Sequence, residues 1–132
     1  MGSPNLYVVF YRPRYGNYQH WALYFDGEKN GVIFEVIGQH PNFRPNVVYA
    51  RPDSSKSYLG NLYIGTLSPG DLKHVEKAAE ETPVDNETLE WDCQEYVLGI
   101  LDKLEDEFVL DSEDEDYQAA REELSNKRGA MI

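Results

Sequence analysis

Cysteine is almost absent from this sequence of 132 residues, because it occurs once, at position 93. A single cysteine excludes a disulfide within the chain and favours a reducing, intracellular location, so we expect a cytoplasmic protein. The first residues lack the charged and apolar regions of a secretory signal. No apolar run is long enough to cross a bilayer, and no transmembrane segment is expected.

Positive charge is also scarce, since 12 Lys and Arg residues stand against 24 Asp and Glu residues, a formal net charge of −12. Duplex binding depends on a basic surface, so we expect no nucleic-acid partner. Adsorption to anionic membranes is disfavoured for the same reason. The sequence has no His and Cys cluster at metal-ligand spacing, no calcium-loop pattern and no phosphate-binding glycine motif, so neither a metal nor a cofactor is expected.

What remains is a globular composition, with 41% hydrophobic residues and enough length for a single domain over residues 1–132. Aromatic and β-branched residues gather between turn residues and predict strands over 6–11, 18–25, 32–37, 46–51 and 59–67. The short connection between the second and third strands predicts an antiparallel hairpin.

Helical periodicity follows, over about 69–81, 92–107 and 112–125. Pro69 lies just inside the start of the first helix, and Ser112 with Glu115 is a candidate cap for the last. The last, acidic helix has few apolar residues, so it should dock at the surface or fray. Strands followed by helices predict an α+β fold, with a mainly antiparallel five-stranded sheet and two to three helices packed on it.

The single cysteine lies at the start of the middle helix. Asp92 and Glu95 have the spacing of a capping box, which places Cys93 at the first helical position, where the helix dipole favours a thiolate. Negative charge on Glu90, Asp92 and Glu95 opposes the thiolate. Cys93 is therefore a nucleophile only if a protonated histidine contacts it, and is otherwise a small buried hydrophobic residue.

Three histidines could supply that contact. His74 lies on the first predicted helix and is expected to be exposed, and His40, in a loop with two prolines, is a reserve candidate. His20 lies within the second strand, on the same face as Ala22 and Tyr24. A histidine on a sheet face opposite a helix with a thiol at its tip suits a Cys–His pair, and a histidine satisfied by local hydrogen bonds is the alternative.

Glu35 is the candidate for a third member, which would orient the imidazole. It interrupts the apolar third strand, and symmetric hairpin pairing places it near Ala22, one diagonal step from His20. A solvent-facing Glu35 is the alternative. Gln39 or His40 would serve instead if the register slips.

Two segments together resemble a known family. His20-Trp21-Ala22-Leu23-Tyr24 in a strand, followed by Asp92-Cys93-Gln94-Glu95-Tyr96-Val97 at a helix start, resembles the circularly permuted papain-like fold. That group includes lecithin–retinol acyltransferase-like proteins and relatives of the NlpC/P60 hydrolases. The resemblance spans roughly residues 18 to 104. It implies Cys93 as nucleophile, His20 as base and Glu35 at the third polar position.

The sequence departs from the acyltransferases of that group at three points. Their cysteine usually follows Asn and precedes Glu-His-Phe, and their third polar residue is commonly histidine. The hydrophobic C-terminal anchor of many members is replaced here by an acidic segment, so the resemblance does not specify a lipid substrate. The desumoylating-peptidase branch also has histidine before cysteine, which keeps a protein or peptide substrate open.

The function expected from these residues is that of a cysteine-dependent hydrolase or acyltransferase, acting through a thioester on a small-molecule, lipid-like or peptide substrate with an amide, ester or thioester bond. The Cys93 backbone N–H is the expected oxyanion donor. Further candidates for substrate or oxyanion contacts are Tyr15, Tyr18, Trp21, Gln94 and His40. The alternative is a non-catalytic binding module on the same fold, with an aromatic cleft and an acidic surface for a basic partner.

Overall fold

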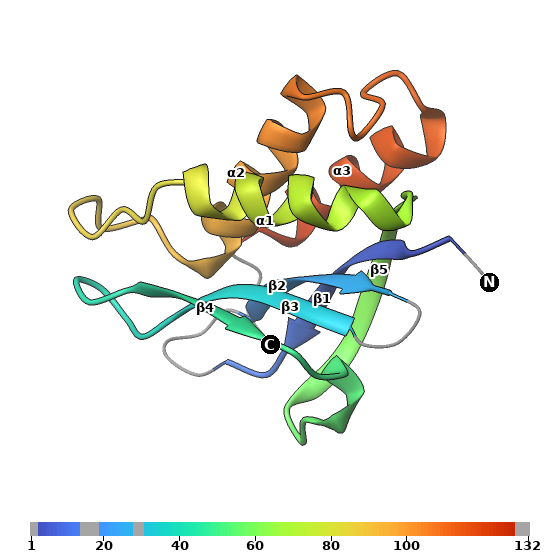
Figure 1. The fold of residues 1–132 in the computed structure, drawn as a ribbon. Helices are drawn as coiled ribbons and strands as arrows, with labels where there is room; N and C mark the ends of the chain where they lie inside the picture. Colours follow the sequence, from blue (N-terminus) through green and yellow to red (C-terminus); the bar gives the residue numbers. More distant parts are fainter. Residues whose placement is uncertain (1–2, 14–18, 28–30, 129–132) are drawn as a thin grey trace.

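A computed structural model describes residues 3–13, 19–27 and 31–128. The five strands of its sheet are β1 (Asn5–Tyr11), β2 (His20–Asp26), β3 (Gly31–Ile37), β4 (Arg44–Val48) and β5 (Tyr58–Thr66). The helices are α1 (Leu72–Glu81), α2 (Cys93–Asp106) and α3 (Glu115–Lys127), with two short 3-10 turns, η1 (Pro52–Ser54) and η2 (Pro69–Asp71). The predicted α+β class is confirmed, and Figure 1 shows the three helices as one layer over one face of the sheet.

The strands pair in the order β4-β3-β2-β1-β5, and every pairing is antiparallel. The predicted hairpin of β2 and β3 is confirmed, and its ladder runs from Asp26 opposite Gly31 to Leu23 opposite Phe34. The first residues of β2 lie beyond that ladder and pair with β1 alone, as His20 does with Tyr11. The sheet therefore splits at the start of β2.

Both edges of the sheet depart from the predicted strands. The fourth strand was predicted over residues 46–51 but runs from Arg44 to Val48 and includes Pro45, opposite Val36. An edge strand tolerates proline because one of its sides has no ladder partner to lose. At the other edge, the pairing of β5 with β1 is interrupted by two register shifts.

The helix starts agree with the sequence in part. Ser68 and Asp71 form a capping box at η2, which runs directly into α1, so Pro69 lies inside a 3-10 turn. The predicted Ser112 cap of the last helix is wrong. Asp114 is the N-cap, and its side chain accepts from the Tyr117 backbone N–H at 2.9 Å, since α3 begins one residue after it.

The last helix is docked, with its few apolar side chains turned inward. Tyr117, Ala120 and Leu124 are buried. The helix packs against β5. Arg121 on its exposed side pairs with Asp102 of α2 at 2.9 Å.

The two faces of the sheet bury different sets of side chains. The inner face, under the helices, contributes to the main core. Its side chains are Leu6, Val8, Phe10, Trp21, Leu23, Phe25, Val32, Phe34 and Val36. The outer face holds a smaller cluster of Val9, Tyr11, Ala22, Tyr24 and Ile33. The predicted alternation along β2 is therefore confirmed.

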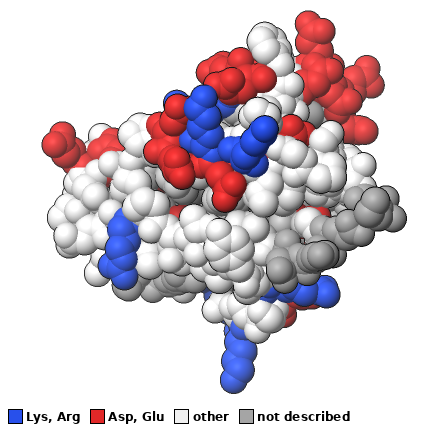
Figure 2. Space-filling view, viewed as in Figure 1, with Lys and Arg blue, Asp and Glu red and all other residues white. Residues whose placement is uncertain are grey.

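Negative charge belongs almost entirely to the helical half of the chain. Residues 1–67 hold 4 Asp and Glu against 6 Lys and Arg, whereas residues 68–132 hold 20 against 6. Figure 2 shows acidic side chains gathered over the helical layer. None of the helices that the structure describes is long and apolar enough to cross a membrane.

Candidate active site

His20 and Glu35 meet on the outer face at the split end of β2. The His20 Nε2 atom lies 2.7 Å from Glu35 Oε1, and each residue is only 5% exposed. Asn46 on β4 donates from Nδ2 to Glu35 Oε2 at 2.8 Å, and the Tyr11 ring lies against the imidazole with a centroid distance of 5.5 Å. Glu35 therefore faces His20 rather than solvent, and the imidazole is held from two sides.

Cys93 is the first residue of α2, as the capping pattern predicted. The Asp92 side chain accepts from the backbone N–H groups of Gln94 at 2.9 Å and Glu95 at 3.4 Å. Glu95 points elsewhere, because its Oε1 atom accepts from Arg128 Nε at 2.8 Å. The helix start is thus capped by Asp92 and tied to the end of α3.

The thiol of Cys93 lies against the free edge of β2. Its Sγ atom is 4.0 Å from the Gln19 carbonyl oxygen, and the Trp21 backbone N–H donates toward it. These two backbone groups are the immediate neighbours of His20. The thiol therefore lies beside the His20 backbone, at the place where β3 has left β2.

One geometric expectation needs correction, since α2 covers the face opposite to the one that carries the His20 ring. Cys93 packs in the main core with Trp21, whereas the imidazole contacts Tyr11 of the outer cluster. Alternation along a strand sends neighbouring side chains to opposite faces. Among the described residues, hydrogen bonds join the imidazole to Glu35 and the thiol to backbone, and none joins the thiol to the imidazole.

Burial is the main electrostatic influence on the thiol. It raises the pKa of Cys93 to about 12, and the negative charge of Asp92 adds to the rise. The Trp21 N–H and the Arg128 guanidinium act in the opposite direction. The acidic neighbours identified in the sequence therefore matter less than burial, and Cys93 in this conformation is a neutral thiol with 4% of its surface exposed.

Arg128 was not foreseen from the sequence as part of this region. Its Nη1 atom donates to Asp92 Oδ2 at 3.2 Å and to Gln94 Oε1 at 2.8 Å, in addition to the pair with Glu95. Gln94, fully buried, also donates from Nε2 to the Gln19 carbonyl at 2.9 Å. Only the folding of α3 against α2 brings this cation to the cysteine helix.

The remaining predicted residues are dispersed. Trp21 is fully buried against Phe10, with ring centroids 5.8 Å apart. His40 is half-buried in the loop between β3 and β4. His74 is exposed on α1, as expected. Tyr15 and Tyr18 lie outside the described residues.

No metal site accompanies these residues in the described part of the chain, where no three His, Cys, Asp or Glu side chains are placed to hold an ion. What the fold brings together is a buried His–Glu pair and a cysteine at a helix start, on an antiparallel sheet. The chain belongs to the family DUF6540, described as a family of unknown function, whose model matches residues 6–111. No curated protein and no solved structure matches the chain. The match ends before α3, so Arg128 lies beyond the matched region.

Proposed function

We propose that this protein is a cysteine-dependent hydrolase or acyltransferase of the permuted papain-like class, acting through a thioester intermediate. Cys93 is the nucleophile, His20 the general base and Glu35 the residue that orients His20. The observation that carries the proposal is the buried His20–Glu35 hydrogen bond, on the strand whose edge the thiol touches. The substrate class is an amide, ester or thioester with a small-molecule, lipid-like or peptide acyl group.

The raised pKa of the thiol decides how such an enzyme would start the reaction. With a pKa of about 12, Cys93 does not rest as a thiolate at neutral pH. The Sγ proton must pass to His20 as the sulfur attacks the acyl carbonyl, in the manner of a serine hydrolase. Nδ1 is the accepting nitrogen, because Nε2 faces Glu35. A side-chain rotation around the edge of β2, on substrate binding, brings the two groups into contact.

The later steps follow from the same groups. The S–C bond forms, the carbonyl oxygen gains negative charge, and protonated His20 gives its proton to the leaving group as the acyl–leaving-group bond breaks. Water or a second acceptor then attacks the thioester and releases Cys93. The Cys93 N–H is available to the oxyanion, since Asp92 engages the next two amides of the helix, Gln94 and Glu95.

An activity screen tests the proposal. Ester, thioester and peptide-amide substrates are offered to the wild type and to Cys93→Ala, His20→Asn and Glu35→Gln, with the exposed His74→Asn as the matched control. Loss of the general base should lower kcat by about 10²–10⁴-fold, whereas His74→Asn should leave it unchanged. Turnover that survives Cys93→Ala would refute the assignment of the nucleophile.

A solvent isotope experiment separates this mechanism from that of a preformed ion pair. Because proton transfer accompanies attack, acylation should be slower in D2O than in H2O, and alkylation of the free enzyme by iodoacetamide should be slow at neutral pH. Rapid alkylation at pH 7 with no isotope effect on acylation would instead indicate a resting thiolate.

A second candidate, a binding module, is supported by a different observation. A groove of about 500 Å³ lies between β4 and α1, with an apolar wall that includes Val47 and Tyr49 and a rim that includes Glu76 and Glu80. Val47 and Tyr49 are 47% and 67% exposed. This groove suits a basic amphipathic peptide. Binding of a labelled Lys/Leu peptide that is lost in Tyr49→Ala and retained in Cys93→Ala would favour this reading.

A further inference from the structure

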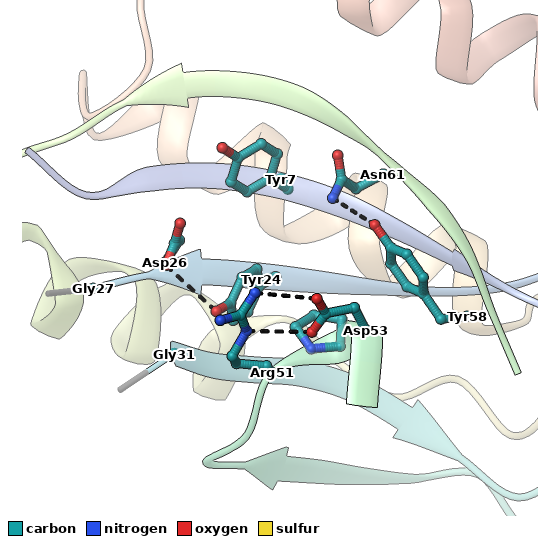
Figure 3. Close-up of a pocket in the computed structure, with 10 residues that line it drawn as sticks. Tyr7, Tyr24, Asp26, Gly27, Gly31, Arg51, Asp53, Tyr58 and Asn61 are labelled. Atoms are coloured by element: carbon teal, nitrogen blue, oxygen red, sulfur yellow. Dashed lines mark hydrogen bonds and ion pairs between the residues drawn. The ribbon is translucent and has the colours of Figure 1, made fainter. Parts of the chain in front are cut away.

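The outer face of the sheet is hollowed at the end of β2 that lies farthest from His20. A pocket of about 310 Å³ is lined there by Tyr7, Tyr24, Asp26, Arg51, Tyr58 and Asn61, among others. Figure 3 shows these side chains converging from β1, β2, β5 and the segment around η1. The volume is at the lower end of the range of about 300–1,000 Å³ that is usual for small-molecule sites.

The floor of the pocket is aromatic. The rings of Tyr7 and Tyr24 are stacked, with centroids 6.3 Å apart and planes inclined by 24°. Gly31 on β3 makes room for Tyr24, because a Cβ atom at position 31 would lie only 2.1 Å from Tyr24 Cε1. Tyr24 is 7% exposed and Tyr7 is half-buried, so the platform is held in place by the sheet.

The rim offers both donors and acceptors of hydrogen bonds. Asn61 donates to the Tyr58 hydroxyl oxygen at 2.8 Å, which leaves the Tyr58 proton to be donated elsewhere. Arg51 uses Nε and Nη2 on Asp53, at 3.2 and 3.1 Å, so its Nη1 has no partner among the described residues. Asp26 accepts from Tyr24 through Oδ1 at 3.4 Å and presents a second carboxylate oxygen.

The charges of the rim select against a charged ligand. Arg51 and Asp53 are paired with each other, as the dashed lines of Figure 3 show, and Asp26 leaves a single excess negative charge. An anion would meet two carboxylates, and a cation would meet the Arg51 guanidinium. A neutral ligand with many hydroxyl groups meets neither penalty.

We propose that this pocket binds a neutral carbohydrate, one pyranose residue in size. The C–H face of a sugar ring would stack on the tyrosine platform, as apolar surface does on aromatic faces. Its hydroxyl groups, each a donor and an acceptor, would match the mixed rim of Tyr58, Asn61, Arg51 and Asp26. The site is separate from Cys93 and does not depend on the proposed activity.

Ligand-observed NMR on the full chain tests the proposal. The probes are D-glucose, D-galactose, N-acetyl-D-glucosamine, L-fucose and D-xylose, with choline, adenosine and inorganic phosphate as the charged and stacking alternatives. At least one sugar should bind saturably with a millimolar Kd and show the largest transfer at its ring C–H protons. Tyr7→Ala should weaken that binding by about tenfold through loss of the platform, and Tyr58→Phe by a smaller factor through loss of one hydroxyl.

Control variants keep the outcome decisive. Tyr49→Ala, on the distant β4 groove, and Cys93→Ala should retain full sugar binding, and near-UV circular dichroism checks that each variant is folded. The proposal is overturned if no sugar of the set binds, if choline, adenosine or phosphate binds more tightly than every sugar, or if Tyr7→Ala and Tyr58→Phe bind like the wild type.

Discussion

The two faces of the sheet differ in what their side chains do. The inner face is apolar throughout and joins the helices in the main core. The outer face has only a small apolar cluster, with the His20–Glu35 pair at one end and the tyrosine pocket at the other. Stability and chemistry are therefore divided between alternate residues of the same strands, and adjacent substitutions should separate them.

The largest effect is expected on the inner face. Leu23→Ala removes a fully buried side chain from the main core and should lower the free energy of unfolding by about 2–5 kcal/mol in urea titrations. Leu59, which is 42% exposed, is the matched control, and Leu59→Ala should cost less than about 0.5 kcal/mol. Equal losses would contradict the placement of the core.

The next effect concerns the polar pair on the outer face. Glu35→Ala takes the partner from His20 and from Asn46, and each group left unsatisfied should cost about 1–3 kcal/mol. Glu35→Gln keeps the shape and one hydrogen bond, so its loss in the same urea titration should be smaller. If both variants are as stable as the wild type, the pair is not held as described.

A pH-dependent effect is expected from the thiol. Burial raises the pKa of Cys93 from 9.0 to about 12, so its stabilisation is complete below pH 9 and is lost as pH rises from there toward 12. Between pH 8 and pH 10 the wild type should lose about 1.4 kcal/mol more stability than Cys93→Ala, because the unfolded thiol ionises first. Parallel curves for the two proteins would show an exposed thiol.

The smallest effect compares two neighbours on β1. Val8 faces the helices and Val9 faces the outer cluster, and both are fully buried. The cavity left by Val8→Ala lies in the tightly packed main core, whereas the smaller outer cluster can relax. We expect Val8→Ala to cost about 1 kcal/mol more than Val9→Ala in urea unfolding. A reversed order would show that the outer cluster is the more rigid one.

The local features of the fold could be predicted from the sequence. The cap of α2 depends on residues three apart, and the β2–β3 hairpin on a short connection, so Asp92 as the cap and Glu35 beside His20 both follow from spacing. The face of the sheet that α2 covers did not follow, because alternation separates two faces without saying which one a helix will bury.

The long-range partners could not be predicted. Asn46 reaches Glu35 because β4 pairs with β3 across a long loop, in a strand whose proline argued locally for a later start. Arg128 reaches the cysteine helix from a segment more than thirty residues away in the chain. Neither contact has a spacing rule, since each depends on tertiary packing.

The edges of the sheet have a consequence for solubility. An exposed edge strand invites pairing with another chain, which is a common route to aggregation. Here the β4 edge is short and contains Pro45, which has no N–H to offer, and the β5 edge is distorted by two register shifts. A second copy of the chain therefore meets no regular edge to extend, and a peptide seated beside β4 would be recognised by its side chains more than by its backbone.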